Sequence, residues 1–334
     1  MDKKSLLILV VCGLAVACTK PREAAESAPE APEAAEAEGA PKADTATGPD
    51  PTPVFEEARP SVTVTALGSA PRHIVRWKFD KGATGTLTLA MEMDVEAKVD
   101  GTAQPSNPTP PIRTTLAIEV QDVTEEGVAS IGVTVKSVGT DPDDEVPEAL
   151  AARIRASLAT MVGTQGTYRC DSRGFVSDVV LDGGAQTPPA VRQALENIRQ
   201  SIRQMIAPLP EPAIGKGATW LVEADYPYSG IVVNERATYT VEKIRPPKLA
   251  VNVSIEQQAA DQSVEGANGK SAELDSLTTK SEGVNRWNLN SPVPRRSTRD
   301  TKMSMTMKGP GTDGSAHVVT LGIHSVVTLT GEAP

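Results

Sequence analysis

Residues 87–99 read "LTLAMEMDVEAKV", and this stretch decides the fold class. Its odd-numbered positions are apolar from Leu87 to Val99, and the positions between them are mostly Thr, Glu, Asp or Lys. Side chains alternate between the two faces of a β-strand, so a period of two predicts a long strand with one buried face. One-sided burial of this kind is typical of antiparallel sheets.

The same alternation recurs at four other places along the chain. These stretches are 116–120, 131–135, 303–307 and 319–329. Several strands of this type, separated by turn residues, predict a mainly antiparallel β protein.

Two segments interrupt the β pattern with apolar residues at helical spacing. The first, 147–161, has Pro147 in a first-turn position that tolerates proline. Its apolar positions are Leu150, Ile154, Leu158 and Met161. Those of the second, 189–206, are Val191, Leu195, Ile198, Ile202 and Met205. We therefore expect an α+β fold in which two amphipathic helices lay their apolar faces against the sheet.

A weak internal repeat divides this β-rich region. The motif "KGAT" occurs at 81–84 and 216–219, and Val120 and Val241 occupy corresponding places further on. A strand-turn-strand is then expected in each half, from Thr167 and from Thr278. The pattern predicts two similar β halves, 61–210 and 211–334, forming a half-barrel or a sandwich. The alternative is two unrelated β segments that share common turn chemistry.

The N-terminus has the three parts of a secretory signal in residues 1–17: basic Lys3 and Lys4, an apolar stretch, and small residues before Cys18. The apolar stretch is shorter than the about 20 residues that a membrane-spanning helix needs. An ordinary signal peptide cut near Ala17 is one interpretation. The other depends on the sequence "LAVAC" at 14–18, which ends in Cys18.

Residues 18–60 are predicted to be a disordered tether. Positions 19–60 hold ten Asp or Glu and four Lys or Arg, with Ala and Pro in most other places. Such a segment buries too little apolar surface to offset the entropy of ordering. The whole chain has a net charge of −10, which argues against nucleic acid as a partner, because phosphates call for clustered Lys and Arg.

The sequence "LAVAC" resembles the bacterial lipobox, whose cysteine receives a diacylglycerol and becomes the new N-terminus. The resemblance implies that Cys18 carries acyl chains such as palmitate and anchors the protein to a membrane. Thr19, in place of an aspartate, favours the outer membrane. With its acidic tether, "YRCDSRGFVSDVV" at 168–180 and "PLPEPAIGKGATW" at 208–220, the chain resembles bacterial lipoproteins of unknown function. More distantly, its strand pattern is similar to the half-barrel of periplasmic lipid and lipoprotein carriers.

No catalytic motif is present, and we expect no enzyme activity, cofactor or metal. His73, His317 and His324 are the three histidines, and His324 is expected to face outward from the last strand. The acidic run "DPDDE" at 141–145 has no calcium-loop spacing and is interpreted as the start of a helix.

Three other features are interpreted as structural. Cys170 shares a strand face with Tyr168 and is expected in the core, and Trp77 and Trp220 are expected to be core residues near the "KGAT" motifs. The basic residues Arg295, Arg296 and Arg299 follow Pro292 and Pro294, which predicts a loop rather than a binding patch.

The sequence favours a non-catalytic envelope lipoprotein that binds an apolar ligand or a lipid. The weak candidate ligand residues are the strand methionines Met91, Met93, Met303 and Met305, because methionine adapts to varied apolar partners. The alternatives are that these methionines fill a core, and that the domain is a structural or partner-docking module of the envelope without a ligand cavity.

Overall fold

The computed structural model describes residues 59–106, 109–141, 146–181, 189–228, 231–265, 271–310 and 315–333. The predicted signal, Cys18 and all but the last two residues of the tether lie outside the described residues. So do residues 142–145 of the acidic run.

The described chain forms two helices and 13 strands. In the first half these are β1 (Ser61–Ala66), β2 (Thr84–Val99), β3 (Thr102–Ala103), β4 (Ile112–Val123), β5 (Ala129–Thr140), α1 (Glu148–Ala159), β6 (Gln165–Cys170), β7 (Val176–Leu181) and α2 (Pro189–Met205). In the second half they are β8 (Thr219–Tyr228), β9 (Ile231–Arg245), β10 (Lys248–Glu265), β11 (Ser271–Asn288), β12 (Arg296–Pro310) and β13 (Ala316–Glu332). The predicted strands and both predicted helices are confirmed.

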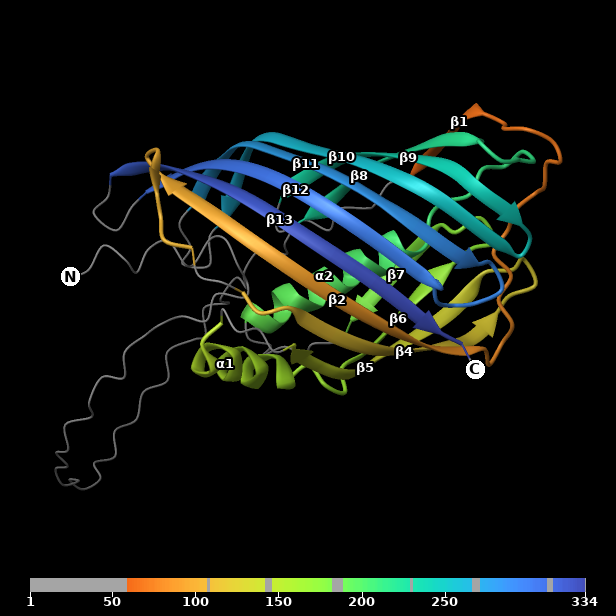
Figure 1. Ribbon diagram of the computed structural model, residues 1–334, viewed down its shortest axis with the longest axis horizontal. Helices are drawn as coiled ribbons and strands as arrows, with labels where there is room; N and C mark the ends of the chain where they lie inside the picture. Colours follow the sequence, from red (N-terminus) through yellow and green to blue (C-terminus); the bar gives the residue numbers. More distant parts are fainter. Residues whose placement is uncertain are drawn as a thin grey trace, which may run out of the picture.

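All strands belong to one antiparallel sheet, in the order β1-β8-β9-β10-β11-β12-β13-β2-β4-β5-β6-β7, with β3 beside β2. Figure 1 shows the long strands arching over α2, while α1 lies near the end of β5. The sheet is therefore a single curved layer around a helix, which confirms the mainly antiparallel α+β fold in its half-barrel form.

Buried apolar residues form two separate clusters. The larger cluster includes both helices, the start of β2 and the strands β4 to β6. The smaller cluster is formed by six residues of β9 to β12: Ile231, Val233, Ala259, Leu274, Leu277 and Met307. The half-barrel thus has one end filled by helices and a second apolar zone on its long strands.

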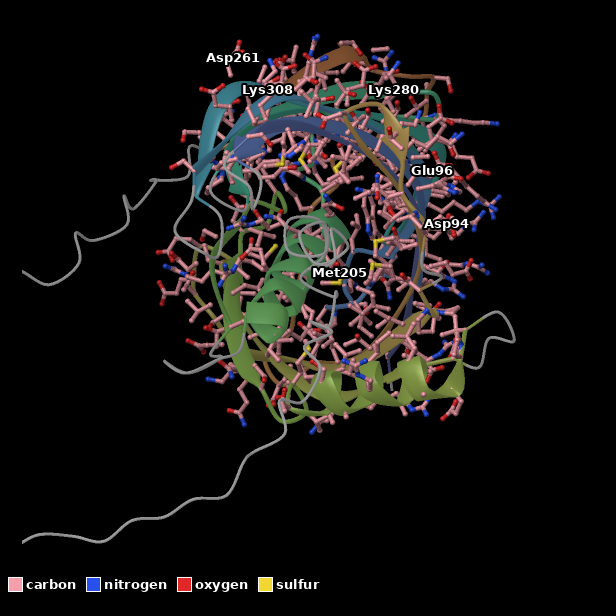
Figure 2. The ribbon with its side chains drawn as sticks, turned by 90° about the vertical axis from the view of Figure 1, so that its left-hand side faces the viewer. Asp94, Glu96, Met205, Asp261, Lys280 and Lys308 are labelled. Atoms are coloured by element: carbon pink, nitrogen blue, oxygen red, sulfur yellow. The ribbon has the colours of Figure 1, made fainter. Side chains whose placement is uncertain are left out.

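Two tryptophans fix the end of α2 inside the sheet. Trp287 Nε1 donates a hydrogen bond of 3.0 Å to the Met205 carbonyl, and Trp220 Nε1 donates one of 2.9 Å to the Pro208 carbonyl. Trp220 also stacks on Tyr239 with ring centroids 5.2 Å apart. Met205 accordingly lies within the curve of the sheet in Figure 2. Trp77 and Trp220 are both buried, as the sequence predicted.

The two "KGAT" motifs adopt the same local structure. Gly82 N donates to Val120 O and Val120 N to Ala83 O, each at 2.8 Å. In the second half, Gly217 N donates to Val241 O and Val241 N to Ala218 O, each at 2.9 Å. The ladder is irregular directly after Val120 and directly after Val241. The two halves therefore share a glycine turn, a hydrogen-bonded pair and a bulge in the same order.

Two expectations about turns and loops differ from the structure. Residues 167–180 form the predicted strand-turn-strand, in which Asp171 Oδ1 accepts the backbone N–H groups of Arg173 and Phe175. Residues 278–288, however, lie within the uninterrupted strand β11, so the second predicted turn is wrong. The loop predicted for Arg295, Arg296 and Arg299 is also wrong in part, because β12 begins at Arg296 and contains Arg299.

Candidate ligand site inside the half-barrel

Cross-strand pairing identifies which side chains face α2. One row of directly paired residues runs Tyr239, Val253, Gly283, Arg299, Val327 and Met91 across six strands. Directly paired residues point to the same face of a sheet. Tyr239 stacks on the buried Trp220 within the large cluster, so this row and every second residue from it face inward.

The four candidate methionines all lie on this inner face and are partly exposed. Met93 pairs with Ser325, while Met303 and Met305 pair with Ile323 and Leu321. Met303 and Met305 pack against the smaller cluster, and Met91 packs against the larger one. The alternating residues Asp94 and Glu96 point outward (Figure 2).

Met307 behaves differently from the other strand methionines. It is only 5% exposed and belongs to the buried part of the smaller cluster. It fills the core, whereas the four partly exposed methionines leave apolar surface accessible on the concave side of the sheet.

A band of polar side chains separates the two apolar clusters on the inner face. We call it the polar seam, and its members are Glu235, Gln257, Thr279, Ser281, Asn285, Ser297, Arg299 and Thr301. The seam crosses β9 to β12 and faces the last turns of α2, because Arg299 contacts Gln204 of that helix. A polar band explains why the apolar interior is divided into two parts.

Hydrogen bonds satisfy the seam only in part. Gln257 Nε2 donates to Glu235 Oε2 at 2.8 Å and also bonds the Tyr226 hydroxyl. The hydroxyls of Ser281 and Thr301 are 2.8 Å apart, and Ser297 donates to the Asn285 side-chain oxygen. Within the described part of the chain, the buried atoms Thr279 Oγ1 and Asn285 Nδ2 have no hydrogen-bond partner. Buried polar atoms without partners are rare in folded proteins and call for an explanation.

Electrostatics at the seam centre on Arg299 and Glu235, the two charged side chains in these inward rows of the described β9 to β12. Burial raises the pKa of the Tyr239 hydroxyl, while the positive charge of Arg299 lowers it and the negative charge of Glu235 raises it. Tyr239 therefore lies within the field of both charges.

A cavity of about 770 Å³ adjoins the seam. It lies between β7 and α2 on one side and β8 to β10 on the other. Gln204, Tyr226, Glu235, Tyr239 and Ile255 are among its lining residues. A volume of this size is in the range of small-molecule sites. The cavity, the seam and the exposed methionines together give the interior a mixed polar and apolar surface.

The other residues considered from the sequence lie away from this interior site. His324 is outward-facing as expected, with Nε2 3.1 Å from Asp300 Oδ1, and His317 contacts Asp100. His73 pairs through its backbone with Ile214. Cys170 is fully buried, as predicted, and burial raises the pKa of its thiol. Among the described residues, no group of three or more His, Cys, Asp or Glu side chains is arranged to hold a metal ion.

Arg299 is the functional candidate that sequence reasoning missed. The signal in the sequence was its spacing. Arg299 lies an even number of residues before Met303, Met305 and Met307, so all four share one strand face. The nearby Pro292 and Pro294 pointed to a loop instead, and the strand begins only two residues after Pro294.

Comparisons with known proteins assign no family. No protein-family description matches the chain, and no curated protein matches it. One solved structure with some similarity is OmpT, an outer membrane protein of Vibrio cholerae, at 8% identity and a TM-score of 0.16. The match covers 74% of this chain and 100% of that one, but so low a score does not establish a shared fold. Within the described residues, neither helix is long and apolar enough to cross a membrane.

Proposed function

We propose that this protein is a non-catalytic lipoprotein of the cell envelope that binds an apolar molecule or a lipid inside its half-barrel. The observation that carries the proposal is the partly exposed, methionine-rich inner face of β2 and β12, in a half-barrel that also holds a cavity of about 770 Å³ lined by other residues. A filled core would bury these side chains as completely as it buries Met307.

The chemistry of the inner face suits a flexible apolar ligand. Met91 and Met93 come from β2 and Met303 and Met305 from β12, and β13 lies between these two strands. Unbranched thioether side chains adapt their shape to different partners. Each buried CH₂ of a ligand contributes about 0.8 kcal/mol, so even a short alkyl chain gains substantial binding free energy from such a wall.

The lipobox-like sequence supports the location that we propose. Acyl chains on Cys18 would hold the protein at the outer membrane, and the acidic tether would separate the domain from the bilayer surface. A protein in this position meets lipids and other envelope components, which are the partners that the interior site suits.

A paired substitution on β12 tests the ligand site. Met303→Gln places a polar amide on the inner face, while Ser304→Gln changes the adjacent exposed residue on the outer face. We expect Met303→Gln to weaken binding of the apolar fluorescent probe N-phenylnaphthylamine by about fivefold or more, because the amide must lose water to contact the probe. Ser304→Gln should leave the affinity within about twofold.

Equal affinities in both variants would contradict an interior site. If the wild-type chain binds no apolar probe at all, the docking-module function gains support, because such a module needs an exterior surface and no ligand space. Circular dichroism of each variant checks that the fold is retained.

A further inference from the structure

Arg299 is a buried cation without a charged partner in the described part of the chain. Its residue is 8% exposed, and its one recorded hydrogen bond runs from Nη1 to the side-chain oxygen of Gln204 at 3.1 Å. Arginines elsewhere in the fold pair with carboxylates, as Arg113 does with Asp141 and Arg236 with Glu223. A guanidinium carries several N–H donors in a planar fork, and one amide oxygen satisfies only part of it.

Burial of an arginine in this way is costly unless an anion or several acceptors complete its shell. The position opposite Arg299 on β11 is Gly283, and a Cβ there would lie 2.1 Å from the Thr298 carbonyl oxygen. The absent side chain leaves the guanidinium without a polar neighbour from β11 in its own row. The other direct neighbour in that row, Val327, is apolar.

Two further seam atoms lack partners, and one of them belongs to the row next to Arg299. Asn285 pairs with Ser297, so its Nδ2 lies one inner row from Arg299, whereas Thr279 pairs with Met303, so its Oγ1 lies two inner rows away on the other side. Asn285 is 0% exposed and Thr279 is 5% exposed, so both atoms are deep inside the half-barrel. The Asn285 amide therefore offers a free donor in the row next to the guanidinium, and hydrogen bonds from such donors to carboxylate, phosphate or sulfate oxygens are strong.

Beyond one polar row at Thr301, the inner face of β12 is apolar and matches an alkyl chain in length. Thr301, Met303 and Met305 follow at alternate positions on the same face of β12. At about 3.4 Å per residue, Met303 lies about 14 Å and Met305 about 20 Å along the strand. A lipid tail spans about half of the roughly 30 Å hydrocarbon core of a bilayer, so these distances match.

We propose that Arg299 binds the anionic head group of an amphiphile whose alkyl tail lies along the inner faces of β12 and β13. This inference rests on the proposed function, because it assumes that an apolar ligand enters the half-barrel. The inference adds the chemical class of the ligand and its orientation, with the head group buried at Arg299. It also names Arg299 as the residue that gives the preference for an anion.

The test compares alkyl compounds that share one tail and differ in charge. Palmitate, hexadecyl phosphate and the neutral hexadecanol are each titrated against the chain from Thr19 onward, which keeps every described residue. The expected result is that both anions bind about tenfold more tightly than hexadecanol or better, since a hydrogen bond to an ionised group is stronger than a neutral one.

Two variants assign this preference to Arg299. Arg299→Gln removes the charge, and Gln204→Glu supplies an internal carboxylate at the group that Arg299 already contacts. Both should bind palmitate and hexadecanol with affinities equal to within about twofold. The second variant keeps the test open if the first one fails to fold.

The outcomes separate this inference from the proposed function. Binding of all three compounds with equal affinity, or an anion preference that survives in both variants, overturns the role of Arg299 and leaves an apolar site. No binding of any alkyl compound overturns the proposed function itself. If the anion preference is found, a further experiment measures extraction of palmitate or of phosphatidylglycerol from vesicles. It shows whether the anionic group belongs to a free fatty acid or to a phospholipid.

Discussion

At the residue scale, Asp100 shows how one carboxylate joins distant parts of the sheet. It lies at a positive φ of 48° in the turn between β2 and β3. Its Oδ1 accepts the Val318 N–H at 2.9 Å, and its Oδ2 is 2.6 Å from His317 Nδ1. The hydrogen bond with His317, followed by that from Val318, lowers the Asp100 pKa.

A local pH dependence follows from this shift. Because the pKa is lower in the folded state, the stabilisation is present above the unfolded value of about 3.9 and is lost as the pH falls through the folded value. We expect the Val318 amide resonance to shift in a transition below about pH 4. In Asp100→Asn the hydrogen bond to Val318 can persist without a titrating group, so the transition should vanish. A Val318 resonance that titrates equally in both proteins would contradict this assignment.

Residue identity alone indicated part of the site. The alternation that places Met91, Met93, Met303 and Met305 on one strand face is a local property, so their shared face could be predicted from the sequence, whereas their role as ligand residues stays a prediction. Arg299 contacts Gln204 of α2 and lies opposite Gly283 of β11. Both neighbours are set by the tertiary structure. No local pattern specifies that a strand arginine will face a helix placed across the sheet.

At the element scale, α2 packs inside the curve of the sheet and contributes buried residues to the larger apolar cluster. Ile202 is 1% exposed on this helix and packs in the larger cluster, whereas Val180 at the sheet edge is 57% exposed. We expect Ile202→Ala to lower the free energy of unfolding by about 2–5 kcal/mol, since it leaves a cavity in a packed core. Val180→Ala, a similar truncation at the surface, should change it by less than about 0.5 kcal/mol.

Urea unfolding followed by tryptophan fluorescence measures both changes, because Trp220 and Trp287 contact the segment that ends α2. A loss of stability in Ile202→Ala no larger than in Val180→Ala would show that α2 is not packed as described.

Strands and helices could be predicted from the sequence because the spacing of apolar residues within a short segment differs between the two element types. The turn predicted in the segment from Thr278 is wrong for a physical reason: the glycine there, Gly283, occupies a strand position where the close Thr298 carbonyl leaves no room for a Cβ. The strand order was not predictable either, because the pairings β1 with β8 and β13 with β2 join segments far apart in sequence.

At the scale of the whole molecule, the proposed lipid anchor and tether would connect the half-barrel to a membrane. If Cys18 carries the lipid, Cys18→Ala should move the protein out of the membrane fraction, because no described helix could replace the anchor. Cell fractionation with a high-salt wash measures this. Variant protein that remains with the membranes after the wash would contradict lipid anchoring through Cys18.

The central claim is that the interior of the half-barrel holds an apolar ligand. Native mass spectrometry of the chain from residue 60 to 334, expressed in the periplasm without the anchor, tests it most directly. We predict extra mass that organic solvent extracts as a lipid or another amphiphile, and a smaller ligand-bound fraction in Met303→Gln. A clean mass of the bare chain under gentle conditions, in wild type and variant alike, would contradict it.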